Sequence, residues 1–88
     1  MQSKYEALEN YLKTRPASVS AVTIPFDELN KILGSSLPES AYTHRPWWGN
    51  QKMTTNRPQA KAWMSAGFEV ETVNQSKSNG SVRFVRSK

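Results

Sequence analysis

The chain contains no cysteine in its 88 residues, and this absence restricts its folding more than any other feature. A domain of this size buries a modest share of its surface, and this one has no disulfides or thiolate metal sites to add stability. Its stability must therefore depend on a single hydrophobic core. Large side chains for that core come from the aromatic residues Tyr5, Tyr11, Phe26, Tyr42, Trp47, Trp48, Trp63, Phe68 and Phe84. We expect one domain over residues 1–88, with most of these rings buried.

The first half is predicted to contain two helices separated by a short strand. Residues 3–6 have the spacing of a capping box, and the helix behind them must end before Pro16. Residues 19–24 are rich in β-branched side chains, and the proline that follows confines this strand to an edge of the sheet. Residues 26–33 carry apolar side chains at helical spacing and acidic ones in the first turn, and Gly34 is a typical helix end.

The second half is predicted to contain a long connector, a third helix and a β-hairpin. Residues 35–57 are too many for a structureless loop, so we expect a short helical turn at 38–42. Pro58 suits the first turn of the third helix. The segments 68–73 and 81–86 alternate apolar and polar residues around turn-forming ones, which indicates a hairpin. Its expected register places Val70 opposite Phe84, Thr72 opposite Val82 and Glu71 beside Arg83.

This order of elements indicates an α+β fold that is winged-helix-like: helix, short strand, helix, long connector, helix and β-hairpin. In such a fold the helix that begins at Pro58 reads the major groove, and the hairpin loop with Lys77 is the tip of the wing. The connector is longer than the roughly three or four residues of a tight helix-turn-helix. A different α+β arrangement with the same element order therefore stays open.

Basic residues gather in the second half of the sequence. Residues 1–44 hold four basic and five acidic side chains, a net charge of −1, whereas residues 45–88 hold eight basic and two acidic ones, a net charge of +6. Lysine and arginine side chains set against phosphates release condensed counterions, so this asymmetry favours a polyanionic partner. The alternative is a solvated basic surface that serves solubility.

The segment from Ala41 to Lys52 concentrates the residue types that bind nucleic acids. Arginine forks onto guanine or phosphate, asparagine pairs with adenine, and tryptophan stacks on bases. One of the adjacent Trp47 and Trp48 is expected to fill the core. Asn50 has the alternative role of closing the turn by hydrogen bonds. The predicted contact residues, including those of the third helix and the hairpin loop, are Arg45, Trp48, Asn50, Lys52, Arg57, Gln59, Lys61 and Lys77.

The sequence offers little for catalysis. His44 is the only histidine, so a multi-histidine metal site is excluded, and its place in a polar segment favours a hydrogen-bonding role. The serines and carboxylates occur where helix capping and turns explain them, and no glycine-rich phosphate loop is present. We expect a protein that is not an enzyme and that needs no metal or cofactor. A hydrolase that uses His44 as a base is the minor alternative.

Several blocks of the sequence resemble a known family. They are Lys4-Tyr5-x-x-Leu8, Val22-Thr23-Ile24-x-Phe26, His44-Arg45-x-Trp47-Trp48-x-Asn50 and Gln59-Ala60-x-Ala62-Trp63. Together they are similar to an uncharacterised bacterial domain of unknown function, which occurs alone and beside nuclease domains. The resemblance covers nearly the whole chain, and its Trp-Trp-x-Asn block is fairly specific. It implies association with DNA or with restriction-type proteins.

We therefore expect a non-enzymatic DNA-binding module, with RNA as the alternative nucleic acid. The competing interpretation is a small adaptor, encoded by a phage or mobile element, whose basic and aromatic connector binds an acidic protein. The N-terminus has no apolar stretch typical of a signal peptide, and no apolar run approaches the roughly 20 residues that span a bilayer. We expect a soluble cytoplasmic protein without membrane contacts. The sequence does not specify its oligomeric state.

Overall fold

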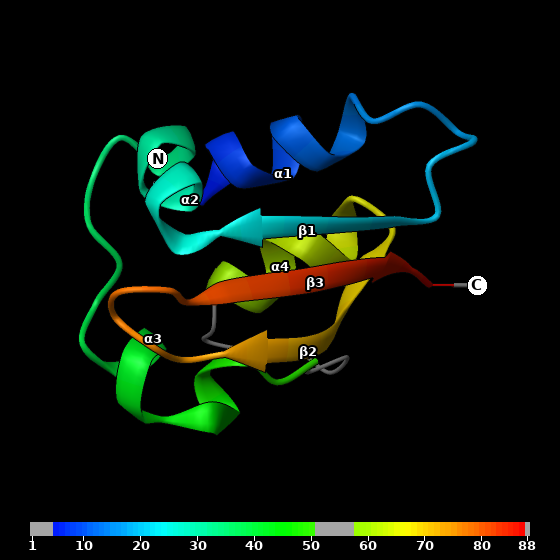
Figure 1. Cartoon of the computed structure of the whole chain (residues 1–88). Helices are drawn as coiled ribbons and strands as arrows, with labels where there is room; N and C mark the ends of the chain where they lie inside the picture. Colours follow the sequence, from blue (N-terminus) through cyan, green and yellow to red (C-terminus); the bar gives the residue numbers. More distant parts are fainter. Residues whose placement is uncertain (1–4, 51–57, 88) are drawn as a thin grey trace.

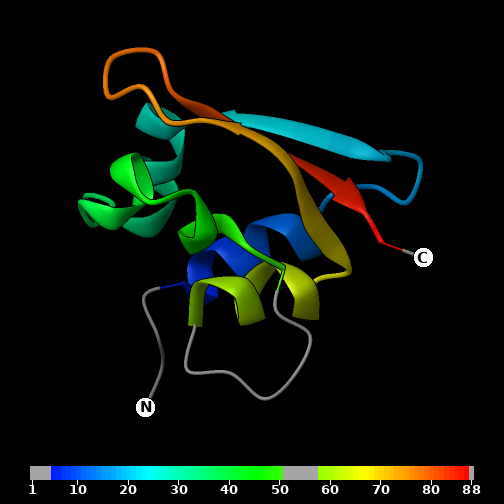
Figure 2. The same cartoon turned by 90° about the horizontal axis from the view of Figure 1, so that it is seen from below.

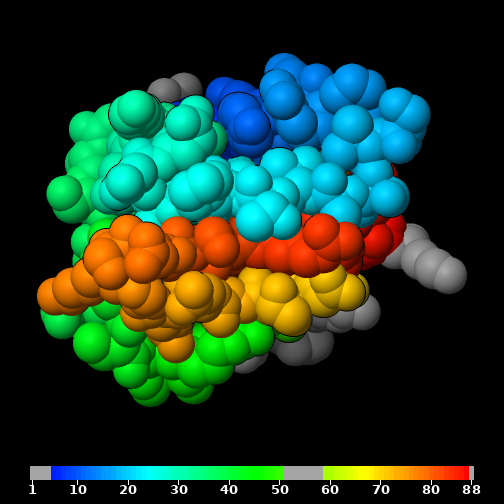
Figure 3. Space-filling view, in the orientation of Figure 1, coloured from blue at the N-terminus to red at the C-terminus, as the bar shows by residue number. Residues whose placement is uncertain are grey.

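The computed structural model describes residues 5–50 and 58–87, which form two layers (Figure 1). One layer is a three-stranded antiparallel sheet, and α1 and α4 lie against one of its faces (Figure 2). The strands themselves line the surface seen in Figure 3, so the other face of the sheet is open. In chain order the elements are α1 (Glu6–Lys13), β1 (Ala21–Pro25), α2 (Phe26–Leu33), α3 (Ser40–Thr43), the 3₁₀ helix η1 (Arg45–Trp48), α4 (Pro58–Ser65), β2 (Phe68–Asn74) and β3 (Ser81–Arg86). The predicted α+β class is confirmed.

The sheet has the strand order β1-β3-β2, so the last strand of the chain lies in the middle. Phe84 of β3 is opposite Val22 of β1 on one side and Val70 of β2 on the other. Because side chains alternate between the faces of a strand, Phe84 and Val82 share the face that packs on the helices, and both are fully buried. β1 lies at an edge, as its terminal Pro25 indicates, and β2 and β3 form the predicted antiparallel hairpin.

The hairpin register agrees with the sequence prediction as far as an irregularity in β2. Val70 has its expected partner, but a β-bulge between Val70 and Thr72 shifts the pairs that follow. Thr72 therefore faces Arg83, and the prediction that it faces Val82 is wrong. A bulge adds one residue to one strand, and the alternation of apolar and polar residues does not reveal it. The predicted contact of Glu71 with Arg83 is confirmed, with 2.6 Å between Oε1 and Nε.

The helices begin and end close to where the sequence predicts. α1 buries Leu8 and Leu12 on one face and has Thr14 as its C-cap. The predicted capping box includes Ser3, which lies outside the described residues. α2 ends at Gly34 with a φ of 76°, a left-handed conformation that glycine adopts at little cost, and α4 starts at its predicted first residue. None of the helices in residues 5–50 and 58–87 is long and apolar enough to cross a membrane.

A row of aromatic rings forms the centre of the core. Trp48 is stacked between Phe26 and Trp63, with ring centroids 5.5 and 5.7 Å away. Phe84 packs against Trp63 at 5.6 Å, and Tyr42 packs against Phe26 at 5.4 Å. Trp63 is 0% exposed, which confirms its predicted burial. The five rings come from four helical segments and the central strand, so one core holds both layers together.

Gly80, the residue before β3, has no room for a side chain. A methyl group there would overlap the carbonyl oxygen of Ser76 and the ring of Phe26. We expect Gly80→Ala to lower the free energy of unfolding by about 2 kcal/mol, measured by urea denaturation. Gly34→Ala is the control, because nothing lies within 4 Å of the added methyl group and its cost of about 1 kcal/mol comes from the backbone alone. A smaller loss for Gly80→Ala than for Gly34→Ala would contradict this packing.

Candidate nucleic-acid interface

Trp48 fixes the shape of the connector between α2 and α4. Its indole N–H donates a hydrogen bond to the carbonyl oxygen of Ala41 (2.9 Å), which joins η1 to α3. The side chain is 1% exposed and belongs to the aromatic row. Trp48 could stack on a base only by leaving the core, so the prediction that it contacts a ligand is wrong. The expectation that one of the two adjacent tryptophans fills the core is confirmed.

The connector also contains Trp47 and His44, which are less buried than Trp48, and Tyr5 packs beside it. Trp47 is partly exposed, and its ring packs against that of Tyr5 with the centroids 6.0 Å apart. Burial raises the pKa of the Tyr5 phenol above its ordinary value of 10.0, so Tyr5 adds no negative charge beside the connector at neutral pH. His44 is exposed, and the described parts of the chain contain no group of three His, Asp or Glu side chains placed to hold a metal ion.

Asn50 is a structural residue. Its side-chain oxygen accepts hydrogen bonds from the backbone N–H of Val70 (2.9 Å) and the indole N–H of Trp63 (3.0 Å), and its amide nitrogen donates to the carbonyl oxygen of Val70 (3.0 Å). The side chain thus occupies the outer edge of β2 as a neighbouring strand would. Asn50 is exposed, but both acceptor positions of its side-chain oxygen are engaged, so a bidentate contact with adenine would have to replace these bonds, and the base-reading role stays a prediction. The alternative role in the turn is replaced by these long-range bonds.

Gln59 is also part of the scaffold. Its side chain is 7% exposed, and Nε2 donates a hydrogen bond to the carbonyl oxygen of Trp47 (3.3 Å), which joins the first turn of α4 to η1. Ala62 is buried as well, because α4 packs against both α1 and β2. The prediction that Gln59 contacts a ligand is therefore wrong. Among the described side chains of α4, Lys61 and Ser65 are exposed.

Two basic residues of β3 are engaged within the domain. Arg83 forms the ion pair with Glu71 on the open face of the sheet. Arg86 donates hydrogen bonds to the carbonyl oxygens of Val19 (2.7 Å) and Pro16 (2.8 Å) and so holds the turn between α1 and β1. The sequence carries no signal for this role, because Arg86 and Pro16 are 70 residues apart. Both arginines therefore already have partners within the domain.

Arg45 and Lys61 are exposed, and neither forms an ion pair within the described part of the chain. Arg45 is the first residue of η1, and Lys61 lies on α4. The hydrogen bond from Gln59 to Trp47 ties these two elements together. Two of the predicted contact residues, Arg45 and Lys61, are therefore accessible cations on two elements that a hydrogen bond joins.

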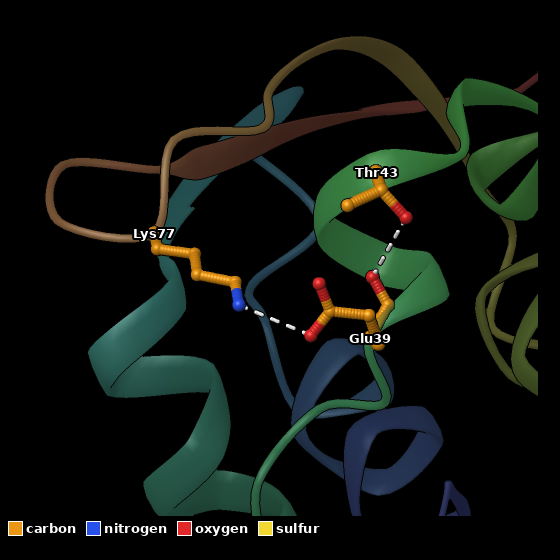
Figure 4. Close-up of polar contacts among 3 residues, drawn as sticks. All are labelled: Glu39, Thr43 and Lys77. Atoms are coloured by element: carbon orange, nitrogen blue, oxygen red, sulfur yellow. Dashed lines mark hydrogen bonds and ion pairs between the residues drawn. The ribbon is translucent and has the colours of Figure 1, made fainter.

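The remaining basic residues among the predicted contacts are Lys52, Arg57 and Lys77. Lys52 and Arg57 lie outside the described residues. Lys77 is exposed in the loop between β2 and β3, but its ammonium lies 3.0 Å from the carboxylate of Glu39 (Figure 4). It also lies 5.5 Å from the centre of the Tyr42 ring. Lys77 is therefore accessible but partly neutralised.

The amino-acid sequence matches a known protein family. One family model matches residues 5–87, which include every described residue. The chain belongs to the family Domain of unknown function (DUF7662). The resemblance of the sequence to a domain family of unknown function is thereby confirmed, and the match to DUF7662 covers both layers of the fold. The comparisons with curated proteins and with solved structures found no match.

Proposed function

We propose that this domain binds nucleic acid, with duplex DNA as the favoured partner, and that it catalyses no reaction. The observation that carries the proposal is the placement of two exposed cations, Arg45 and Lys61, on elements that Gln59 ties together. Neither cation has an ion-pair partner among the described residues, so both are available for phosphates. The net charge of +6 over residues 45–88 supports the same partner.

The element order and the terminal hairpin support a winged-helix-like arrangement. In that arrangement α4 lies along the duplex, and the loop between β2 and β3 is the wing. The outward face of α4 is narrow, because Lys61 and Ser65 are its exposed side chains among those that the structure describes. The amides of Asn50 and Gln59, which are suited to base edges, are bonded within the domain. This favours contacts with phosphates, so we propose binding with a weak preference for sequence.

Replacing Arg45 or Lys61 with glutamine is expected to weaken binding to duplex DNA. Each substitution should also lower the slope of log K against log[salt] by about 0.9, because each phosphate contact releases counterions. Fluorescence anisotropy of a labelled duplex, titrated at several salt concentrations, measures both quantities. Arg83→Gln is the control: it removes the same charge from a residue already paired with Glu71, and it should leave the slope close to that of the wild type.

Unchanged slopes in both variants would show that the interface lies elsewhere. Titrations with single-stranded DNA and RNA of the same length identify which nucleic acid is preferred. If none of the three binds, the proposal fails and the adaptor for an acidic protein takes its place. In that case the partner protein would stay bound when unrelated duplex DNA is added in excess.

A further inference from the structure

The loop between β2 and β3 is held against α3 by two side chains. Gln75 donates a hydrogen bond from Nε2 to the carbonyl oxygen of Ala41 (3.0 Å). Further along the loop, Nζ of Lys77 lies 3.0 Å from Oε1 of Glu39 (Figure 4). The two side chains of this ion pair are 63% and 69% exposed. Water and salt screen an ion pair in such a position, so another anion can displace Glu39 at little cost.

Neither the loop nor α3 needs this ion pair to keep its place. The bond from Gln75 fixes the start of the loop, and at its end the carbonyl oxygen of Gly80 accepts a hydrogen bond from the amide of Phe26 (2.9 Å). In α3, the hydroxyl of Thr43 donates to the backbone carbonyl of Glu39 (3.2 Å) and not to its carboxylate (Figure 4). The carboxylate can therefore be changed without loss of the local structure.

The tip of the loop carries the polar groups that position nucleic-acid phosphates. Ser78 and Asn79 follow Lys77, and the three residues contribute to the lining of a hollow of about 430 Å³. Hydroxyl, amide and ammonium groups together are typical of contacts with the sugar-phosphate backbone. Asp27 lines the same hollow from the start of α2 and repels an anion there. Because Asp27 disfavours an anion in the hollow, a phosphate is expected beside Lys77 at the loop tip and not deeper in the hollow.

We propose that Glu39 competes with DNA phosphates for Lys77, so that the loop between β2 and β3 is a second phosphate-binding site kept partly neutral in the free protein. This inference rests on the proposed function. The loop packs on α3 through Gln75, and α3 ends two residues before Arg45 in the chain. When the duplex binds, a phosphate takes the place of the carboxylate, and the repulsion by Glu39 limits the affinity.

Glu39→Gln tests this competition, because glutamine has nearly the same shape without the charge. We expect its affinity for duplex DNA to rise by about two- to fivefold at low salt, because the carboxylate no longer competes with the phosphate for Lys77. Glu71→Gln is the control, since it removes the same charge from another surface ion pair, whose side chains are 47% and 50% exposed, on the open face of the sheet. Its gain should be clearly smaller. In the double variant with Lys77→Gln, the gain from Glu39→Gln should disappear.

The outcomes separate this inference from the proposed function. If the wild type binds no duplex, the proposed function fails and the inference fails with it. If the wild type binds and Arg45 and Lys61 contribute as expected, equal gains for Glu39→Gln and Glu71→Gln would overturn the inference alone, because the effect would then be one of net charge. A gain that persists in the double variant would overturn it too. Melting temperatures of the variants, expected to stay close to that of the wild type, show that binding is compared between folded proteins.

Discussion

Trp63→Ala is expected to lower the free energy of unfolding by about 3–5 kcal/mol, enough to leave much of the protein unfolded at room temperature. The indole ring is fully buried between the rings of Trp48 and Phe84, so its removal leaves a cavity at the centre of the core. It also removes the donor that Asn50 accepts from (3.0 Å). Because the same ring joins η1, α4 and β3, both layers lose their shared contact.

Urea denaturation followed by far-ultraviolet circular dichroism measures this loss. Trp47→Ala is the matched control, since it removes the same side chain from a partly exposed position and should cost much less. Trp63→Phe keeps a ring in the row and should fall between Trp63→Ala and the wild type. A cost for Trp63→Ala no greater than that for Trp47→Ala would contradict the central place of Trp63 in the core.

Asn50→Ala is expected to lower the free energy of unfolding by about 2–3 kcal/mol. The substitution leaves the indole N–H of Trp63 and the backbone N–H and C=O of Val70 without their present partners. Removing one side of a hydrogen bond costs more than the bond contributes, because the group left behind is poorly solvated. Thermal unfolding of the variant beside the wild type measures the effect.

Asn50→Asp separates the contribution of the side-chain oxygen of Asn50 to stability from that of its amide nitrogen. The carboxylate still accepts from Trp63 and from the N–H of Val70, but it cannot donate to the carbonyl oxygen of Val70 and it repels that oxygen. Its stability should therefore lie between those of Asn50→Ala and the wild type. At temperatures where the variant is folded, Asn50→Ala should keep the wild-type salt slope for duplex DNA. A stable Asn50→Ala with altered sequence preference would contradict the structural role.

Most elements of the fold could be predicted because each has a local signal in the sequence. Gly34 ends α2 and Pro58 begins α4 where their conformational preferences indicate, and alternation outlines both strands of the hairpin. The bulge in β2 has no such signal, because it depends on how two strands match and not on one strand alone. The order of strands in the sheet likewise depends on contacts between distant segments.

The candidate site could be predicted only in part, because a residue type does not specify its partner. Asparagine and glutamine are suited to base edges and equally to backbone groups, and here Asn50 and Gln59 bind the backbone of Val70 and Trp47. Arginine is suited to phosphate and equally to carbonyl oxygens, which Arg86 binds 67 and 70 residues away. The sequence could predict exposed cations such as Arg45, because a residue of this kind needs no partner within the chain.

The central position of β3 determines when the domain can fold. β1 and β2 are not neighbours, and each pairs with β3, which is the last element of the chain. While the ribosome is still making residues 81–86, neither strand has a partner, and the core lacks Val82 and Phe84. The helices can form during synthesis, but the sheet closes late, through contacts as distant as that of Pro16 with Arg86. Until then the strand edges are exposed, and chaperone binding or aggregation competes with folding at that stage.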